Sequence, residues 1–219
     1  MMKAIAILIV LAGTFACIQA ALPNVGTCNY ENYNNKIRTC ITQFIKVCQE
    51  NPNGKCSIYY DSFIDCSAKS AISCFPSLLI DQMKASLKQI IPEEYMCEKA
   101  GLQAPDLSQI KVTIPCDISL SEYQNKINKC SDNFVKKWSA NRADSTLCRE
   151  YLNVKNCVKN TIHKYCQLKG DIQEAFDYQF DNYNPFCPKS VDPGSKVSSI
   201  AVSKVAIVIS LVAAAIQAL

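Results

Sequence analysis

The chain has 219 residues, with 14 cysteines, a single histidine, and 23 basic against 19 acidic residues. This near balance of charge does not indicate the concentrated basic surface by which proteins bind nucleic acid, so no nucleic-acid partner is predicted. With one histidine and no glycine-rich phosphate loop, the sequence predicts no catalytic residue, no metal site and no cofactor.

The first 20 residues have the pattern of a secretory signal peptide. Lys3 supplies the basic start, an apolar stretch runs over 4–12, and small residues follow at Ala16 and Ala20. The apolar stretch is too short to span a bilayer. We predict cleavage after Ala20; cleavage after Ala16 and an uncleaved anchor helix are the alternatives. Secretion leads to an oxidising compartment, where many cysteines predict disulfides.

One cysteine pattern then occurs twice. The counterparts are Cys28 and Cys116, Cys40 and Cys130, Cys56 and Cys148, Cys66 and Cys157, Cys74 and Cys166, and Cys97 and Cys187. Around them, Tyr33, Asn35, Lys36, Ile37, Cys40, Phe44 and Lys46 recur 90 positions later as Tyr123, Asn125, Lys126, Ile127, Cys130, Phe134 and Lys136. We therefore predict an all-α fold of two tandem disulfide-stapled three-helix modules, over 21–97 and 116–187, with 98–115 as the linker.

Helical periodicity opens the first module, with a stripe at steps of four, three and four residues. The stripe consists of Tyr33, Ile37, Cys40 and Phe44. Proline, asparagine and glycine at 52–54 then break the helix. A second helix carries the next three cysteines, and a third is predicted over 76–91.

The second module repeats this order. No glycine or proline occurs between Cys116 and Lys169, which favours helix. Ser119 or Ser121 is expected to cap the first helix, with Glu122 in its first turn. A break over 141–145 precedes a second helix with three cysteines, and a third helix is predicted over 170–183.

The twelve repeated cysteines are expected to form disulfides inside their own modules, because each module holds a complete set. Six cysteines allow fifteen pairings, and the spacing does not select one. Cys48 is left over, and its counterpart is Trp138, the single tryptophan. Three roles are open for Cys48: a disulfide between two chains of a homodimer, burial as a small apolar residue, or a disulfide with Cys17 after cleavage at Ala16.

The C-terminal end has the pattern of a cleaved glycosylphosphatidylinositol (GPI) signal. Residues 205–219 are apolar except for Ser210 and Gln217, and no basic cluster follows them. Gly194 and Ser195 are the small residues at the expected attachment distance. We predict a stalk over 188–194 and a removed propeptide over 195–219; a tail anchor or single-pass helix is the alternative. The part between the two signals then carries a net charge of +1.

Candidates for catalysis are few. The single histidine, His163, lies inside a predicted helix and has no counterpart in the first copy. The carboxylate pairs Glu93/Glu94 and Asp177/Asp181 are interpreted as solvated helix faces rather than as a glycosidase pair. An aromatic set is interpreted mainly as core, with an interface as the alternative. It consists of Tyr59, Tyr60, Tyr178, Phe180, Tyr183 and Phe186.

Each copy thus has a cysteine, a helix with a cysteine at its end, a spaced trio such as Cys148, Cys157 and Cys166, and a terminal cysteine after an aromatic-rich segment. This arrangement resembles the cysteine-rich helical domains of unknown function of nematode and other invertebrate secreted proteins. The resemblance implies tandem domains on a secreted or surface protein and supplies no catalytic residue. Cys48 has no place in that pattern, and the spacing within the trio differs by one residue between the copies.

Together these patterns predict a non-enzymatic, GPI-anchored recognition protein on the outer face of the plasma membrane, with a secreted form as an alternative. Its partner is expected to be an extracellular protein, a glycan or a lipid. The alternative functions are a carrier of a small apolar ligand and a structural coat protein. A carrier would line its cavity with Leu78, Leu79, Met83, Leu87, Ile90 and Tyr95.

Overall fold

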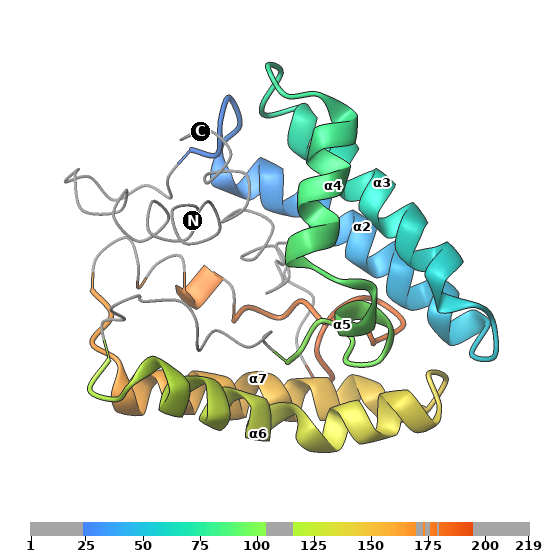
Figure 1. Cartoon of the computed structure of the whole chain (residues 1–219). Coiled ribbons are helices and arrows are strands. Elements are labelled where there is room, and N and C mark those ends of the chain that lie inside the picture. Colours follow the sequence, from blue (N-terminus) through green and yellow to red (C-terminus); the bar gives the residue numbers. More distant parts are fainter. Residues whose placement is uncertain (1–23, 104–115, 170–172, 174–175, 179, 195–219) are drawn as a thin grey trace.

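The computed structural model describes residues 24–103, 116–169, 173, 176–178 and 180–194. The predicted signal peptide, Cys17, most of the linker, Ser195 and the C-terminal apolar segment lie outside this part. The described residues are mainly helical and contain no β-strand. Their helices are α2 (Tyr30–Glu50), α3 (Cys56–Ile72), α4 (Ile80–Ile90), α5 (Glu93–Cys97), α6 (Leu120–Ala140) and α7 (Leu147–Tyr165) (Figure 1).

Two helical hairpins dominate the structure, α2 with α3 and α6 with α7 (Figure 1). Both first helices begin at a side-chain cap: Asn29 Oδ1 accepts from Asn32 N at 2.7 Å, and Ser119 Oγ accepts from Glu122 N at 3.1 Å. Such caps satisfy backbone donors that the first turn leaves unpaired. Ser119, rather than Ser121, is therefore the capping residue of α6.

The six disulfides have the same connectivity in both modules: first cysteine to fifth, second to fourth, third to sixth. The pairs are Cys28–Cys74, Cys40–Cys66 and Cys56–Cys97 in module 1, and Cys116–Cys166, Cys130–Cys157 and Cys148–Cys187 in module 2. The second-to-fourth bridge joins the two helices of each hairpin. The first-to-fifth bridge joins a cysteine before the first helix of the hairpin to a cysteine after its second helix.

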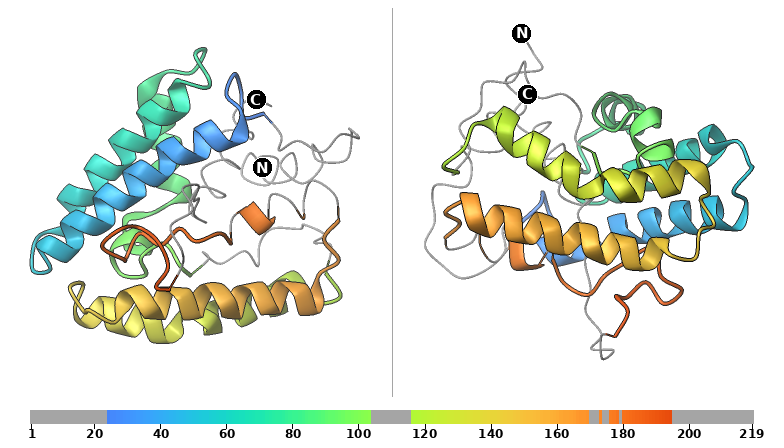
Figure 2. Two further views of the ribbon diagram at one scale, coloured as in Figure 1. Left: turned by 180° about the vertical axis from the view of Figure 1, so that it is seen from behind. Right: turned by 90° about the horizontal axis from the view of Figure 1, so that it is seen from below.

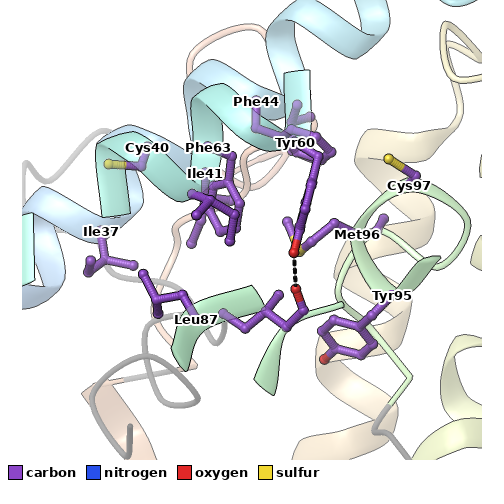
Figure 3. Close-up of a cluster of buried hydrophobic side chains, with 14 of the residues drawn as sticks. Ile37, Cys40, Ile41, Phe44, Tyr60, Phe63, Leu87, Tyr95, Met96 and Cys97 are labelled. Carbon is purple, nitrogen blue, oxygen red and sulfur yellow. Dashed lines mark hydrogen bonds between the residues drawn. The ribbon is translucent and has the colours of Figure 1, made fainter. Parts of the chain in front are cut away.

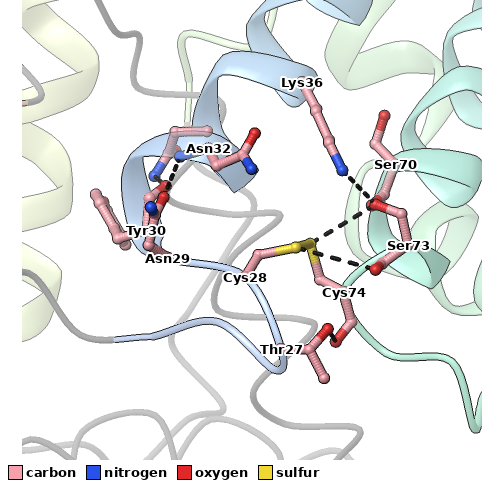
Figure 4. Close-up of a disulfide and its surroundings, with 10 residues drawn as sticks. Thr27, Cys28, Asn29, Tyr30, Asn32, Lys36, Ser70, Ser73 and Cys74 are labelled. Carbon is pink, nitrogen blue, oxygen red and sulfur yellow. Dashed lines mark hydrogen bonds between the residues drawn. A yellow bond between two sulfur atoms is a disulfide. The ribbon is translucent and has the colours of Figure 1, made fainter.

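Figure 4 shows this closing bridge in module 1, between Cys28 and Cys74. Cys74 lies just beyond the end of α3, not inside it as predicted, and its carbonyl accepts from Thr27 N at 2.8 Å and from Thr27 Oγ1 at 3.1 Å. Lys36 Nζ donates to Ser73 Oγ at 2.8 Å beside the disulfide. The chain around this covalent link is thus also held by hydrogen bonds.

The core of module 1 is closed by α4 and α5. Met83 and Leu87 of α4 are almost fully buried, and Tyr60 Oη of α3 donates to Ile91 O at 2.8 Å just after α4 (Figure 3). The predicted third helix, over 76–91, is present but shorter. Pro92 then precedes α5, a short helix that the sequence analysis did not predict.

In module 2 the region that corresponds to α4 is described only in part, and its described residues are helical only up to Tyr178. Gln173 and residues 176–178 are helical, but 180–183 form a turn, a bend and a bridge, so the predicted helix over 170–183 ends early. Two side chains here accept hydrogen bonds from backbone amides: Asp181 Oδ1 accepts from Tyr183 N, and Asn184 Oδ1 accepts from Phe186 N. Such local bonds compete with helix, and Pro185 disfavours helical backbone before it.

Residues 188–194, predicted as a stalk, belong to the folded body. Val191 pairs with Tyr183 in a β-bridge, and Asp192 N donates to Asn182 O at 2.7 Å. The Asp192 side chain is buried. Pro193 and Gly194 are the first exposed residues after it. Residues 188–194 are therefore part of the fold up to Gly194, the last residue that the structure describes.

Candidate functional site

The two modules share one continuous core, and the segment 180–194 runs between their hairpins (Figures 1 and 2). At the centre, Trp138 of α6 is fully buried, and its Nε1 donates to Cys97 O of module 1 at 2.9 Å. Its ring meets Phe186 edge-on, with centroids 5.7 Å apart. Trp138 thus belongs to the shared core, and its N–H, which a buried indole has to satisfy, makes the hydrogen bond to module 1.

The turns of the two hairpins also meet. Arg142, after α6, donates from Nη1 to Pro52 O at 3.3 Å and to Gly54 O at 3.5 Å, both in the turn after α2. Both turns therefore lie on the same side of the molecule (Figure 1). Both helix breaks were predicted from the sequence, but the contact between them was not.

Four charged side chains form a largely buried cluster across the interface: Arg38, Lys155, Asp181 and Asp192. Arg38 Nη2 of α2 lies 3.3 Å from Asp181 Oδ2, and its guanidinium lies over the Tyr183 ring at 4.4 Å. Lys155 Nζ of α7 donates to Asp181 O at 2.7 Å, to Tyr183 O at 3.0 Å and to an oxygen of Asp192. Each cation in this charge cluster therefore faces an anion.

Burial dominates the electrostatics of the charge cluster. It lowers the pKa of Arg38 to about 10, although Asp181 acts in the opposite direction. It also lowers the pKa of Lys155 and raises the pKa of Asp181, because each charged form loses water. Tyr183 Oη forms a hydrogen bond with Thr42 Oγ1 at 2.7 Å and donates to Arg38 O at 3.1 Å. These two bonds fix α2 against the segment 180–194.

An open pocket of about 300 Å³ lies beside the charge cluster. Its lining includes Lys155, Asn156, Lys159, Asn182, Asp192 and Gly194. We call it the exit pocket, because its lining includes Gly194, the last residue that the structure describes and a predicted attachment residue. Ammonium groups, carboxylates and amides together can bind a polar ligand through hydrogen bonds. A second, shallower surface pocket is lined by Asp61, Ser62, Asp65, Cys66 and Lys69.

Cys48 is the described cysteine outside a disulfide, and it is fully buried. Burial raises the pKa of its thiol from 9.0 to about 11, with Arg142 acting in the opposite direction. A buried protonated thiol is a poor nucleophile and does not reach a second chain without unpacking. The geometry thus favours the buried role over the bridge between two chains, and Cys17 lies outside the described residues.

The structure places the other residues that were considered for catalysis in separate surroundings. His163 is exposed, with its ring against Phe176 at 5.4 Å. Glu93 and Glu94 are exposed at the start of α5, and Glu94 pairs with Lys99. Asp177 accepts from Gln173, whereas Asp181 belongs to the charge cluster.

The aromatic set also divides by burial. Its buried members are Tyr60, Tyr183 and Phe186, and its partly buried members are Tyr59, Tyr178 and Phe180. Tyr183 contacts module 1, and Phe186 packs inside module 2 against Phe134, Trp138 and Tyr151. Of the two attachment residues, Gly194 is exposed and Ser195 lies outside the described residues.

The charge cluster was not predicted from the sequence. Its signal is a second stripe on α2, one position after the repeated one: Asn34, Arg38, Ile41, Ile45 and Cys48, all buried. A basic residue within a helical stripe of otherwise small or apolar side chains marks a buried contact. Lys155 gives the same signal on α7, between the buried Tyr151 and Val158.

Over the described residues, no group of histidine, cysteine and acidic side chains is arranged to hold a metal ion. None of the described helices combines the length and apolarity needed to cross a bilayer. Comparisons of the chain with protein families, with curated proteins and with solved structures found no significant match.

Proposed function

We propose that the protein is a GPI-anchored recognition protein on the outer face of the cell, which binds an extracellular protein or glycan without catalysis. The observation that carries the proposal is the union of two disulfide-stapled modules through a buried interface. Trp138 and the charge cluster hold the modules in one fixed arrangement.

A fixed arrangement suits binding, because surfaces that are already ordered lose less conformational freedom when a partner docks. Two similar modules also offer two related surfaces to one partner or to two. Stability against the extracellular environment comes from six disulfides in the described chain.

The location rests on the two ends of the sequence. The N-terminal pattern predicts secretion, and the C-terminal pattern predicts lipid attachment at Gly194 or Ser195. The exposure of Gly194 supports this, because a transamidating enzyme needs access to the attachment residue.

The carrier hypothesis finds less support. Of its proposed lining residues, Met83 and Leu87 are packed in the core and Leu79 is exposed. The two pockets described above have other linings. The coat-protein hypothesis agrees with the disulfides but gives no reason for the exit pocket.

The location is tested on intact animal cells that express the full reading frame. Phosphatidylinositol-specific phospholipase C should release the protein as a monomer on both reducing and non-reducing gels. Protein that stays on the membrane would contradict the lipid anchor. A reducible dimer would restore the intermolecular role of Cys48.

Recognition is tested by presenting the released protein in multivalent form to arrays of extracellular proteins and glycans. A saturable partner is expected, and the reduced and alkylated protein is the control, since it keeps the composition but loses the fold. Native mass spectrometry of the same sample tests the carrier: a co-purifying lipid would favour the carrier over recognition.

A further inference from the structure

The exit pocket has an unusual position, because the predicted lipid-attachment residue is part of its lining. Gly194 is exposed with a φ of +81°, and a Cβ built on it would meet nothing within 4 Å. Asp192, two residues before it, is buried and bonded to Lys155. Whatever is attached at Gly194 therefore starts at the mouth of this pocket.

Among the described charged side chains around the exit pocket, one cation has no ion-pair partner. Arg38 pairs with Asp181, and Lys155 pairs with Asp192. Lys159, one helical turn after Lys155, forms no ion pair within the described part of the chain and is half-buried in the pocket wall. Among the described residues, the exit pocket thus presents one ammonium without an ion-pair partner, together with the amides of Asn156 and Asn182.

We infer that the exit pocket binds the head of the protein's own anchor, with Lys159 against the anchor phosphate and the two asparagine amides against the first sugar. The inference rests on the proposed anchoring. In that reaction the bond between Gly194 and Ser195 breaks, an amide forms between the Gly194 carbonyl and the ethanolamine amine, and the amine proton passes to the new amino group of Ser195. The ethanolamine phosphodiester that follows carries one negative charge.

This match is chemical as well as spatial. A single phosphodiester charge balances the ammonium of Lys159, and hydrogen bonds to an ionised partner are among the stronger ones in proteins. Sugar hydroxyls both donate and accept, as do the amides of Asn156 and Asn182. The bound anchor head would hold the folded body directly on the membrane, with segment 180–194 as the connection.

The test compares two forms of the protein by hydrogen exchange and mass spectrometry. One form is released from cells by phosphatidylinositol-specific phospholipase C and keeps the phosphoethanolamine and glycan. The other ends at Gly194 and is secreted without an anchor; it keeps every described residue. In the anchored form, peptides covering 152–160 and 182–194 should exchange about threefold to tenfold more slowly, as expected for a charge-assisted hydrogen bond that is partly open to water.

Lys159→Ala should abolish this difference, while Lys164→Ala, an exposed lysine farther along α7, should leave it intact. Equal exchange in the two wild-type forms would overturn the inference and leave the proposed anchor standing. A difference that persists in Lys159→Ala would also overturn it, because the protection would not come from the phosphate contact. Absence of enzymatic release would overturn the anchor and this inference together.

Discussion

The two modules share a disulfide scaffold and differ in what closes it. Both have a hairpin, a bridge between its helices and the same connectivity, but module 1 is closed by α4 and α5, and module 2 by the segment 180–194 with its buried charges. The difference teaches that the shared cysteines fix the hairpin and tether the segment that follows it, but do not set the conformation of that segment. In module 2 that segment has become the contact with module 1 and the connection to the predicted anchor.

The largest expected effect comes from removing equivalent disulfides, which tests whether the scaffolds are interchangeable. Cys56–Cys97 and Cys148–Cys187 span 41 and 39 residues. Replacing either pair by alanines should lower the free energy of unfolding by about 4 kcal/mol, because loops of this length restrict the unfolded chain similarly. Urea denaturation measures both losses. A much smaller loss in one module would show that the interface, not the bridge, maintains it.

Replacement of Trp138 by alanine tests the shared core. It should destabilise the protein by about 3 to 4 kcal/mol, since a fully buried indole and its hydrogen bond to Cys97 O are lost. The matched change at the equivalent position, Cys48→Ala, should cost about 1 kcal/mol, because far less area is removed. Thermal unfolding compares the two. Similar values would mean that the two positions contribute equally to the contact between the modules.

The charge cluster is tested by Arg38→Met, which leaves Asp181 without its cation. The expected loss is about 3 kcal/mol, because an unpaired buried charge is costly. The double change Arg38→Met with Asp181→Leu should recover most of it. Lys46→Met on the exposed face of α2 is the control and should change the free energy by less than about 0.5 kcal/mol. An equal loss in Lys46→Met would refute a specific role for the cluster.

A smaller effect is expected at the two helix caps. Asn29→Ala and Ser119→Ala should each cost about 1 kcal/mol, because each removes one side-chain acceptor at the start of α2 or α6. Chemical denaturation resolves such values when the two variants are compared with wild type. A clear inequality between the two losses would show that one hairpin depends more on its cap than the other hairpin does.

The pH dependence of Cys48 is the most local effect. Folding raises its pKa from 9.0 to about 11, so its contribution to stability is fully present below pH 9 and is lost between about pH 9 and 11. At pH 8 iodoacetamide should label Cys48 only after unfolding. Cys48→Ala should reduce the fall in stability above pH 9. Rapid labelling of the native protein at pH 8 would contradict the buried thiol.

Parts of the structure follow from local sequence alone. The gap-free repeat around Tyr33 and Tyr123 predicted both first helices, and Ser119 was one of two expected caps. The completeness of each cysteine set predicted bridges within modules, as the structure has them. These features depend on residues close in sequence, where helical periodicity and capping have direct physical signatures.

The sequence by itself determined an all-α, disulfide-rich, duplicated chain, because helical periodicity and the repeat are properties of the residue order alone. Only the tertiary structure selected one disulfide pairing from fifteen, ended the last helix of module 2 before Phe180, and joined Arg38 to Asp181 across 143 positions. The spacing of cysteines along the chain does not say which of them lie close together in the fold. The energy of a buried charge likewise depends on the partner that the fold brings to it. The same holds for the exit pocket, whose walls come from α7 and from the segment 180–194, for which the sequence alone predicted the end of a helix and a stalk.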